Sequence, residues 1–342
     1  MAKKTSVLLI YTGGTIGMIQ DNRTGQLKPF DFAHLTEQIP ELHKFDLRLS
    51  SETFQHPIDS SDMSPERWIQ IARIIEKNYT RYDGFVILHG SDTMAFTASA
   101  LSFMLENLDK PVILTGSQLP IGIIRTDGKE NLITAIEIAA AKEKGKAVIR
   151  EVCIYFEYRL YRGNRTHKFN AEHFQAFQSS NYPELAEAGV HLMYKYDKLY
   201  RPLRKKLKVH TTLDPNIAIL KLFPGITAAF LEATLNTKGL RAVILETFGS
   251  GNCSTAPWFI EILGKARRKG LILLNITQCN AGSVEQGKYE ASAGLDQMGV
   301  INGRDMTTEA AVAKLMFVLG HCKNRREAEQ LLKTSLRGEM TI

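Results

Sequence analysis

The sequence predicts an α/β protein of two domains, each based on a parallel β-sheet, with a larger N-terminal and a smaller C-terminal domain. Apolar runs of strand length alternate along the chain with segments whose apolar residues recur at helical spacing. Such alternation is typical of a parallel sheet covered by helices on both faces. It occurs in two blocks, and 342 residues are enough for about two domains.

A basic, tyrosine-rich stretch separates the two blocks and marks the expected domain boundary. It covers residues 194–212 and includes the positively charged cluster at 201–208. We therefore predict an N-terminal α/β domain at 1–193, a linker at 194–212 and a C-terminal α/β domain at 213–342.

The individual elements follow from the spacing of the apolar residues. In the first block we expect strands at 7–11, 84–90 and 110–117, and helices at 93–108 and 128–144. In the second block we expect strands at 242–249 and 271–276, and helices at 258–269, 308–319 and 325–336.

Composition points to a globular protein of the cytoplasm. Apolar residues make up 44% and charged residues 23% of the chain, as in soluble proteins. No apolar run is long enough to span a bilayer, so we expect no membrane association. The first residues pass directly into a predicted strand, so we expect no signal peptide. The four cysteines lie far apart, which favours free thiols in a reducing compartment and gives a zinc site little support: Cys153, Cys253, Cys279 and Cys322.

The net charge of +7 raises the question of a nucleic-acid partner. Much of this charge lies in a few clusters, such as the one at 201–208. The sequence contains no RNA-binding aromatic motif, zinc finger or helix-turn-helix signature. A solvated surface or linker is the better interpretation of the cluster, so we expect no nucleic-acid partner.

The first predicted strand ends in a glycine-rich turn that carries two hydroxyls. The apolar run 7–11 suits a buried parallel strand, and Gly13 and Gly14 allow a sharp turn beside a ligand. Ligands of open α/β sheets bind at the carboxyl ends of strands, which is where Thr12 and Thr15 fall. An ordinary turn capped by threonine hydroxyls explains the same stretch equally well.

Two phosphate-binding motifs do not fit this turn. The dinucleotide fingerprint needs Gly-x-Gly-x-x-Gly, and although Gly14 and Gly17 match its last two positions, Thr12 occupies the first. A P-loop needs Gly-x4-Gly-Lys, but Met18 stands where its second glycine belongs. We therefore expect neither a dinucleotide nor a nucleoside triphosphate.

Three further segments place polar side chains where a strand gives way to a loop. They are the acceptors and hydroxyls at 59–62, the hydroxyl and carboxylate at 89–93, and the basic stretch at 162–168. Each has an alternative interpretation. Ser64, and either Ser91 or Asp92, can serve as N-caps of the helices that follow, and the basic stretch can be an ordinary surface loop.

Together these segments resemble one family. The stretches Thr12-Gly13-Gly14-Thr15-Ile16-Gly17 and His89-Gly90-Ser91-Asp92-Thr93-Met94 are similar to the two signature motifs of bacterial-type L-asparaginases. The stretches 85–90, 101–108 and 160–166 resemble the type I, cytoplasmic branch. The likeness continues through 277–279 to 336–339, so it covers essentially the whole chain. It implies the two-domain asparaginase-like fold, with catalysis in the N-terminal α/β domain.

The resemblance implies hydrolysis of the side-chain amide of L-asparagine to L-aspartate and ammonia. Acyl transfer from an amide needs a nucleophile, a base and a group that stabilises the oxyanion. By the resemblance, Thr15 attacks the amide carbon and forms an acyl-enzyme. Ser91, Asp92 and Lys168 match the hydroxyl, carboxylate and amine of the family. A partly buried lysine beside a carboxylate can act as the base when desolvation favours its neutral form.

The resemblance also implies how the substrate is held. Asp59, Ser60 and Ser61 match the residues that bind the α-carboxylate and the α-amino group, and Ser91 and Asp92 belong to the same substrate site. Asp92 has two tasks, because it also orients the lysine amine. The resemblance implies no metal ion and no organic cofactor.

Two departures from the family pattern concern the catalytic residues. The usual residue at position 91 is Thr, and Ser91 keeps the hydroxyl but loses the methyl group that restricts rotation about χ1. Family members often carry a Tyr in the loop after the first motif. Here the loop at 19–29 has none, and Gln26 or Leu27 stands closest to that position.

A third departure concerns regulation. Some type I enzymes bind a second asparagine at an allosteric site through an Arg, and Glu246 stands at that position here. Thr277 and Cys279 match the other positions of that site. Because a glutamate repels an α-carboxylate, we expect no inherited allostery.

Two other functions compete with the amidohydrolase. One is a subunit of a tRNA-dependent amidotransferase, which carries an additional N-terminal domain, whereas Thr12 here follows directly on the first strand. The other is a non-catalytic amino-acid-binding protein, against which the retention of Thr15, Asp92 and Lys168 speaks. The resemblance further implies a homodimer or homotetramer, in which Asn252 reaches a neighbouring site.

Overall fold

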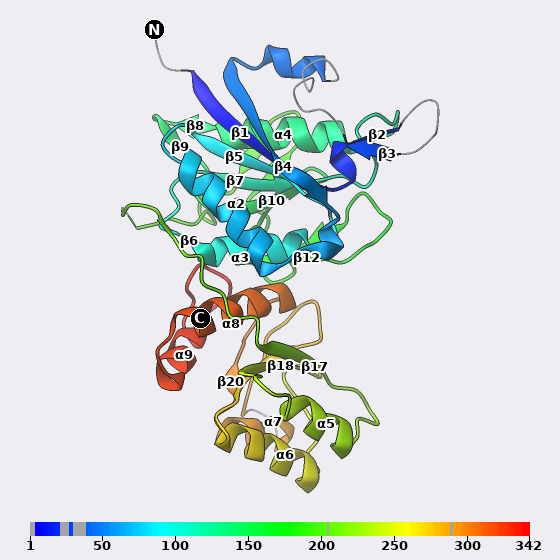
Figure 1. Ribbon diagram of the computed structural model, residues 1–342, viewed down its shortest axis with the longest axis vertical. Coiled ribbons are helices and arrows are strands. Elements are labelled where there is room, and N and C mark those ends of the chain that lie inside the picture. Colours follow the sequence, from blue (N-terminus) through cyan, green and yellow to red (C-terminus); the bar gives the residue numbers. More distant parts are fainter. Residues whose placement is uncertain (1–3, 21–26, 30–38, 204, 288–289) are drawn as a thin grey trace. The chain divides into compact units, whose positions relative to one another are not determined.

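The computed structural model describes residues 4–20, 27–29, 39–203, 205–287 and 290–342. The chain divides into two compact units, Met1–Thr211 and Thr212–Ile342, and each contains an α/β sheet of its own (Figure 1). Within the stretch 194–212, Tyr194 ends a strand of the main sheet of the first unit, and Lys208 and Val209 form a short strand in the same unit.

The main sheet of the first unit has eight strands. In spatial order they are β15 (Leu192–Tyr194), β14 (Ala186–Ala188), β11 (Arg159–Arg162), β10 (Val152–Phe156), β7 (Val112–Thr115), β5 (Gly84–Leu88), β1 (Thr5–Gly13) and β4 (Leu47–Ile58). The five strands from β10 to β4 are parallel. The apolar runs predict β1, β5 and β7 among them, but not β4 and β10. The strands β11, β14 and β15 extend the sheet in antiparallel fashion, which the sequence analysis does not predict.

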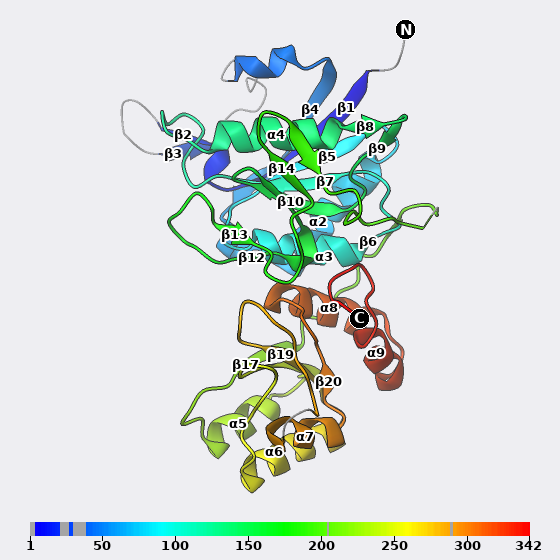
Figure 2. The same cartoon turned by 180° about the vertical axis from the view of Figure 1, so that it is seen from behind.

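Helices cover both faces of this sheet. They are α2 (Pro65–Asn78), α3 (Met94–Met104) and α4 (Gly128–Ala140). Helix α4 packs on β5, β7, β1 and β10 from one face, whereas α3 packs on β7 and β10 from the other and is accompanied by α2 (Figure 2). The two-sided cover explains why β5, β7 and β10 are buried along their whole length.

Short elements complete the first unit. Paired two- and three-residue strands are β2 (Met18–Gln20) with β3 (Leu27–Pro29), β6 (Leu105–Glu106) with β16 (Lys208–Val209), β8 (Lys142–Glu143) with β9 (Lys146–Ala147), and β12 (His167–Lys168) with β13 (Phe177–Gln178). The 3₁₀ turns are η1 (Thr15–Gly17), η3 (Pro40–Lys44), η4 (Ser60–Asp62) and η5 (Gly163–Arg165).

The second unit is a smaller three-layer α/β fold. Its four parallel strands lie in the order β17 (Ile217–Lys221), β18 (Ala242–Thr247), β19 (Ile272–Thr277) and β20 (Ile301–Asn302). The helices are α5 (Ala228–Leu235), α6 (Pro257–Arg268), α7 (Glu290–Gln297), α8 (Thr308–His321) and α9 (Arg325–Leu332). In this unit α8 lies on one side of the sheet, and α5, α6 and α7 lie on the other (Figure 1).

Two predicted helices end earlier than expected. The helix predicted at 93–108 stops at Met104, because Leu105 and Glu106 pair with β16 and Asn107 takes a left-handed conformation with φ 61°. The helix predicted at 128–144 stops at Ala140. The last residues of the predicted helix belong instead to the β8–β9 hairpin, whose turn at Lys144 and Gly145 has positive φ values that a helix does not allow.

The helix predicted at 325–336 also ends early. Helix α9 ends at Leu332, because the backbone N–H groups of Leu336 and Arg337 bond to the carboxylate of Glu339 instead of continuing the helix. That carboxylate is fully buried and lies 2.7 Å from Nζ of Lys314 in α8. The C-terminal segment is therefore anchored to α8 by a buried ion pair.

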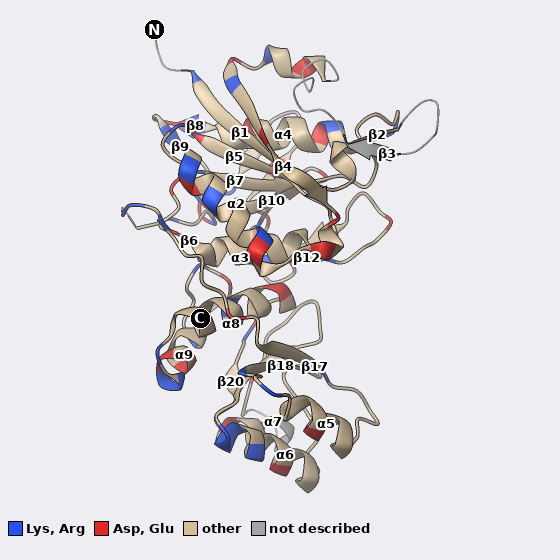
Figure 3. Ribbon diagram, viewed as in Figure 1, with Lys and Arg blue, Asp and Glu red and all other residues tan. Residues whose placement is uncertain are grey.

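The described residues of the basic cluster, 201–203 and 205–208, form a loop and the start of β16 beside β6 (Figure 3). The four described basic side chains of this cluster are exposed: Arg201, Lys205, Lys206 and Lys208. Among the helices that the structure describes, none combines the length and the apolar character needed to cross a membrane.

Candidate active site

The carboxyl end of β1 places Thr15 against the backbone of the second signature motif. Gly14 has φ +88°, which L side chains rarely adopt. A Cβ added to Gly14 would lie only 2.4 Å from the backbone nitrogen of Gly90. Only a glycine therefore allows η1, which begins at Thr15, to pack directly on the turn that leads to Ser91.

A buried tyrosine also holds η1 in place. Tyr11 lies in β1, and its hydroxyl donates a hydrogen bond of 3.0 Å to the carbonyl oxygen of Gly17. Burial raises the pKa of Tyr11 to about 12, so its hydroxyl remains a donor at neutral pH. The turn that carries Thr15 is thus held at both ends, by Gly90 and by Tyr11.

The acidic and hydroxyl cluster at 59–61 lies at the carboxyl end of β4, beside the same turn. Oδ1 of Asp59 accepts hydrogen bonds from the backbone N–H of Ser61 at 2.8 Å and from its hydroxyl at 2.7 Å. These bonds hold the pKa of the Asp59 carboxyl below its usual value. Thr93 Oγ1 donates to the carbonyl oxygen of Ser60 at 2.6 Å, which ties this cluster to the second motif.

Ser91 and Asp92 contact Lys168 rather than capping α3. Nζ of Lys168 lies 2.9 Å from Oγ of Ser91 and 2.6 Å from Oδ1 of Asp92. The N-cap of α3 is Thr93, and its side chain makes no capping hydrogen bond. The helix-cap interpretation of Ser91 and Asp92 is therefore wrong.

The basic stretch 162–168 is buried at 162–166 and half-buried at 167–168, so the interpretation as a surface loop is also wrong. Arg162, Asn164, Arg165 and Thr166 are all buried. The Arg162 guanidinium is paired with the carboxylate of Glu151 at 2.7 Å.

This stretch packs closely on α3. A Cβ on Gly163 would lie 2.9 Å from Cβ of Ala98, a residue of α3. Because α3 begins just after Ser91 and Asp92, this packing brings Lys168 to their side chains. The side chain of Lys168 is only 15% exposed, whereas that of Asp92 is 65% exposed.

The structure thus brings the predicted site residues to one edge of the parallel sheet. The turn at Thr15 abuts Gly90, the 59–61 cluster is tied to Thr93, and Lys168 contacts both Ser91 and Asp92. A hydroxyl on a tight turn, a hydroxyl–amine–carboxylate cluster and a second carboxylate are the groups that acyl transfer from an amino-acid amide requires.

The sequence analysis missed a buried chain of side chains beneath this edge. His89 contacts the Gly90 carbonyl oxygen through Nδ1 and Thr97 Oγ1 through Nε2, and Trp68 donates to the same Thr97 oxygen. Its members come from α2, α3 and the end of β5. No pattern in the sequence signals it, because a histidine at the end of an apolar strand and a threonine within an apolar helix are both unremarkable alone.

Two departures from the family pattern concern the loop at 19–29 and Glu246, and the structure describes them to different extents. The loop at 19–29 contains the β2–β3 pair, and Gln26 lies outside the described residues. In the second unit, Glu246 is buried, and its Oε1 accepts a hydrogen bond of 2.6 Å from Thr308 Oγ1. Thr277 Oγ1 donates to the Gly249 carbonyl, and Cys279 is exposed.

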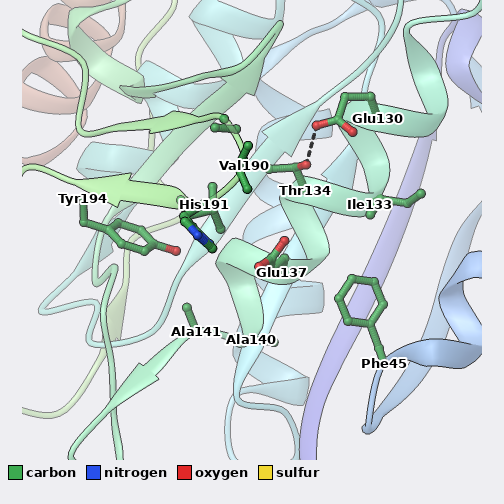
Figure 4. Close-up of a pocket in the computed structure, with 13 residues that line it drawn as sticks. Phe45, Glu130, Ile133, Thr134, Glu137, Ala140, Ala141, Val190, His191 and Tyr194 are labelled. Carbon is green, nitrogen blue, oxygen red and sulfur yellow. Dashed lines mark hydrogen bonds between the residues drawn. The ribbon is translucent and has the colours of Figure 1, made fainter.

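A separate pocket of about 690 Å³ lies against α4 and contains none of the predicted site residues (Figure 4). Its wall includes Glu130, whose carboxylate accepts a 2.6 Å hydrogen bond from Thr134, together with Glu137 and Tyr194. Within the described ranges, no group of three or more His, Cys, Asp or Glu side chains is arranged to hold a metal ion.

Comparison with known proteins identifies the family. The family model described as "Asparaginase, N-terminal" matches residues 6–200, and "Glutaminase/Asparaginase C-terminal domain" matches residues 216–332. The chain belongs to the asparaginase family. As a family member it has the two α/β domains that the sequence predicts, so the predicted fold class is confirmed.

Relatives of this asparaginase-family chain carry different names. "L-asparaginase 1" of Escherichia coli (strain K12) is 42% identical over 343 residues, which cover 99% of both chains. The "60 kDa lysophospholipase" of Mus musculus is 40% identical over 366 residues, and this chain spans only 64% of its length. The crystal structure of L-asparaginase I from Vibrio cholerae superposes with a TM-score of 0.90 at 40% identity, covering 99% of this chain and 100% of that one.

Proposed function

We propose that the chain is an L-asparagine amidohydrolase that converts L-asparagine to L-aspartate and ammonia. The observation that supports this most directly is the contact of Lys168 with both Ser91 and Asp92, beside the turn that carries Thr15. An asparaginase-family chain that is 42% identical over nearly its full length to E. coli L-asparaginase 1 is expected to use such a cluster for the same reaction.

In the proposed mechanism, Thr15 is the nucleophile. A threonine hydroxyl is weak at neutral pH and needs a base. As the Thr15 oxygen attacks the amide carbon, its proton passes through the hydroxyl of Ser91 to the Lys168 amine. The C–N bond then breaks, the proton passes to the leaving ammonia, and water hydrolyses the aspartyl ester to regenerate Thr15.

The substrate's α-amino and α-carboxylate groups bind at the ends of β4 and β5. Because its pKa is lowered by the two hydrogen bonds from Ser61, Asp59 is ionised at neutral pH and suits the α-ammonium group. Asp92 is the more exposed partner of Lys168, so its carboxylate can also face that ammonium group. Ser60 and Ser61 supply hydroxyl and backbone donors for the α-carboxylate. These roles require neither a metal ion nor an organic cofactor.

We also propose that the protein works in the cytoplasm as a homodimer or homotetramer. All four cysteines are free thiols, which suits a reducing compartment. By the resemblance, Asn252, which is partly exposed in this chain, is the residue that we expect to reach a neighbouring subunit's site. Sedimentation velocity of the purified protein measures the oligomeric state.

The test is ammonia release by the purified chain from L-asparagine, L-glutamine and D-asparagine, with Thr15→Ala as the control. Release from L-asparagine that is lost in the control supports the proposal. Binding of L-asparagine in calorimetry without ammonia release would instead identify a binding protein. Release that occurs only with an added amidotransferase partner would identify a subunit of such a complex.

The name of the mouse relative requires one further assay. Lysophosphatidylcholine is supplied to the same protein preparations, and fatty-acid release is measured. The asparaginase proposal fails if wild type releases fatty acid from lysophosphatidylcholine but no ammonia from L-asparagine. If Thr15→Ala also loses the fatty-acid release, Thr15 is the nucleophile for an ester substrate.

A further inference from the structure

A buried hydrogen-bond chain runs from α2 to the turn that carries Ser91. The indole N–H of Trp68 donates to Thr97 Oγ1 at 3.0 Å. Thr97 Oγ1 lies 2.9 Å from Nε2 of His89, and Nδ1 of His89 lies 2.7 Å from the carbonyl oxygen of Gly90. The three side chains are at most 5% exposed, so they bond to one another rather than to bulk water.

The direction of each hydrogen bond follows from the two ends of the chain. The Gly90 carbonyl oxygen can only accept, so Nδ1 of His89 must carry the ring proton. The Trp68 indole can only donate, so the Thr97 hydroxyl uses its own proton to donate to Nε2. Burial lowers the pKa of His89 to about 4, which keeps the imidazole neutral at neutral pH. One tautomer therefore satisfies all three bonds.

This tautomer fixes the orientation of the Gly90–Ser91 peptide. In a trans peptide the C=O and N–H bonds point in opposite directions. Since His89 holds the Gly90 carbonyl in the interior, the N–H of Ser91 points away from the imidazole. The N–H of this peptide belongs to Ser91, whose hydroxyl contacts Lys168, and Gly14, which precedes Thr15, packs on the neighbouring His89–Gly90 peptide.

We propose that His89 is a positioning residue, whose Nδ1–H keeps the Gly90–Ser91 peptide in the orientation that presents the Ser91 N–H to the oxyanion of the reacting amide. Thr97 and Trp68 support it by holding the ring in the required tautomer. The inference rests on the proposed amidohydrolase function, because it assigns the N–H a task in acyl transfer. Backbone N–H donors oriented before the reaction are an effective way to stabilise an oxyanion.

A matched pair of substitutions separates this role from simple packing. The amide nitrogen of Asn takes nearly the place of Nδ1, so His89→Asn keeps a donor for the Gly90 carbonyl. The longer Gln takes the place of Nε2, so His89→Gln keeps a partner for Thr97 and loses that donor. Both variants remove the ring, and packing alone predicts similar losses for the two.

The proposal predicts different kinetics for the two variants. His89→Gln loses about a hundredfold in kcat, as expected when an oxyanion donor is misplaced, while KM changes by less than about threefold. In His89→Asn, kcat stays within about tenfold of the wild-type value, because the Asn amide holds the Gly90–Ser91 peptide as His89 does. Equal kcat losses in the two variants, at equal melting temperatures, would overturn the proposal.

Thr97 offers a second test that does not depend on His89 variants folding. Thr97→Val is close in shape and removes the hydroxyl that donates to Nε2, so the Nδ1 tautomer keeps only one of its two supports, the Gly90 carbonyl. We expect a loss of about tenfold in kcat with KM little changed, whereas Thr97→Ser keeps the hydroxyl and most of kcat. A folded Thr97→Val variant with the kcat of wild type would count against a role of the hydrogen-bond chain in catalysis.

The tautomer can be measured without any activity. Protein with ¹⁵N-labelled imidazoles is examined by NMR at pH 7, and His89 is assigned by comparison with His89→Asn. We expect a proton on Nδ1 and none on Nε2, and a shift towards the other tautomer in Thr97→Val. A proton on Nε2 in wild type would refute the arrangement. If wild type shows the Nδ1 tautomer but releases no ammonia from asparagine, the proposed function fails and the peptide-holding role of His89 is supported.

Discussion

Nζ of Lys168 lies 2.6 Å from Oδ1 of Asp92, although the two residues are 76 positions apart in the chain. The contact exists because the stretch around Gly163 packs on α3, the helix that follows Asp92. The amine is mostly buried and the carboxylate mostly exposed. One end of the ion pair therefore faces the protein interior and the other faces solvent.

Removing the nucleophile is the first prediction. Thr15→Ala should fold normally, because the side chain is small and lies in a turn. Turnover of L-asparagine should fall by at least about a thousandfold, on the order of 4 kcal/mol in activation free energy. Steady-state ammonia release measures kcat. A variant that keeps more than about a tenth of the wild-type kcat would exclude Thr15 as the nucleophile.

The Lys168–Asp92 pair should behave as a unit. Lys168→Met and Asp92→Asn should each lower kcat by a factor similar to that of Thr15→Ala, and the double variant should be little worse than either single one. Lys265→Met is the matched control, because this lysine pairs with Glu261 at 2.8 Å on the exposed surface of α6. Strictly additive losses in activation free energy would mean that the two groups act independently.

Ser91 should tolerate the addition of a methyl group but not the loss of its hydroxyl. Ser91→Thr should keep activity or raise it, because the methyl group restricts χ1 and fixes the hydroxyl beside Lys168. Ser91→Ala should abolish most of the activity, since Nζ of Lys168 loses its contact at 2.9 Å. If Ser91→Ala were nearly as active as wild type, the hydroxyl would have no part in proton transfer.

Asparagine saturation should be hyperbolic, with a Hill coefficient near 1. By the family resemblance, Glu246 stands where some type I enzymes carry an Arg that binds a second α-carboxylate. Its own carboxylate accepts a hydrogen bond from Thr308 and lies 4.0 Å from Lys221, so it offers that ligand no positive charge. Without that contact a second asparagine has no differential affinity for two states. A sigmoidal curve that is abolished by Cys279→Ala but not by Glu246→Gln would show an effector site rebuilt around other residues.

Stability should fall in acid partly because of His89. Burial lowers its pKa to about 4 in the folded protein, against an ordinary value of 6.5. Between these two pH values the unfolded chain binds a proton that the folded protein does not, so the free energy of unfolding decreases as the pH falls through this window, by about 3 kcal/mol. Above the window the contribution is constant.

Urea unfolding at several pH values measures this effect. His89→Asn lacks the titrating ring, so its stability should decrease less between neutral pH and pH 4 than that of wild type. The carboxylates and the remaining histidines titrate in both proteins, so their contributions cancel in the comparison. Parallel curves for the two proteins would show that His89 is protonated equally in the folded and unfolded states.

Much of the fold was predictable because it depends on local patterns. The apolar runs of β5, β7 and β18 are buried on both faces, and a strand of that kind has the same signature wherever it lies in the sheet. The ends of α3 and α4 were not predictable in the same way. Leu105 and Glu106 leave the helix to pair with β16, which lies about a hundred residues further along the chain.

The sequence by itself determined which residue types form the candidate site, because two signature motifs and a basic stretch resemble one family in the same order along the chain. Only the tertiary structure decided what those residues touch. It replaced the cap interpretation of Ser91 and Asp92 with contacts to Lys168, and it buried a basic stretch that composition alone assigns to the surface. It also revealed the buried hydrogen-bond chain that joins Trp68, Thr97 and His89. The physical reason is that helical and strand periodicity are local properties, whereas hydrogen bonds between distant segments depend on how whole elements pack.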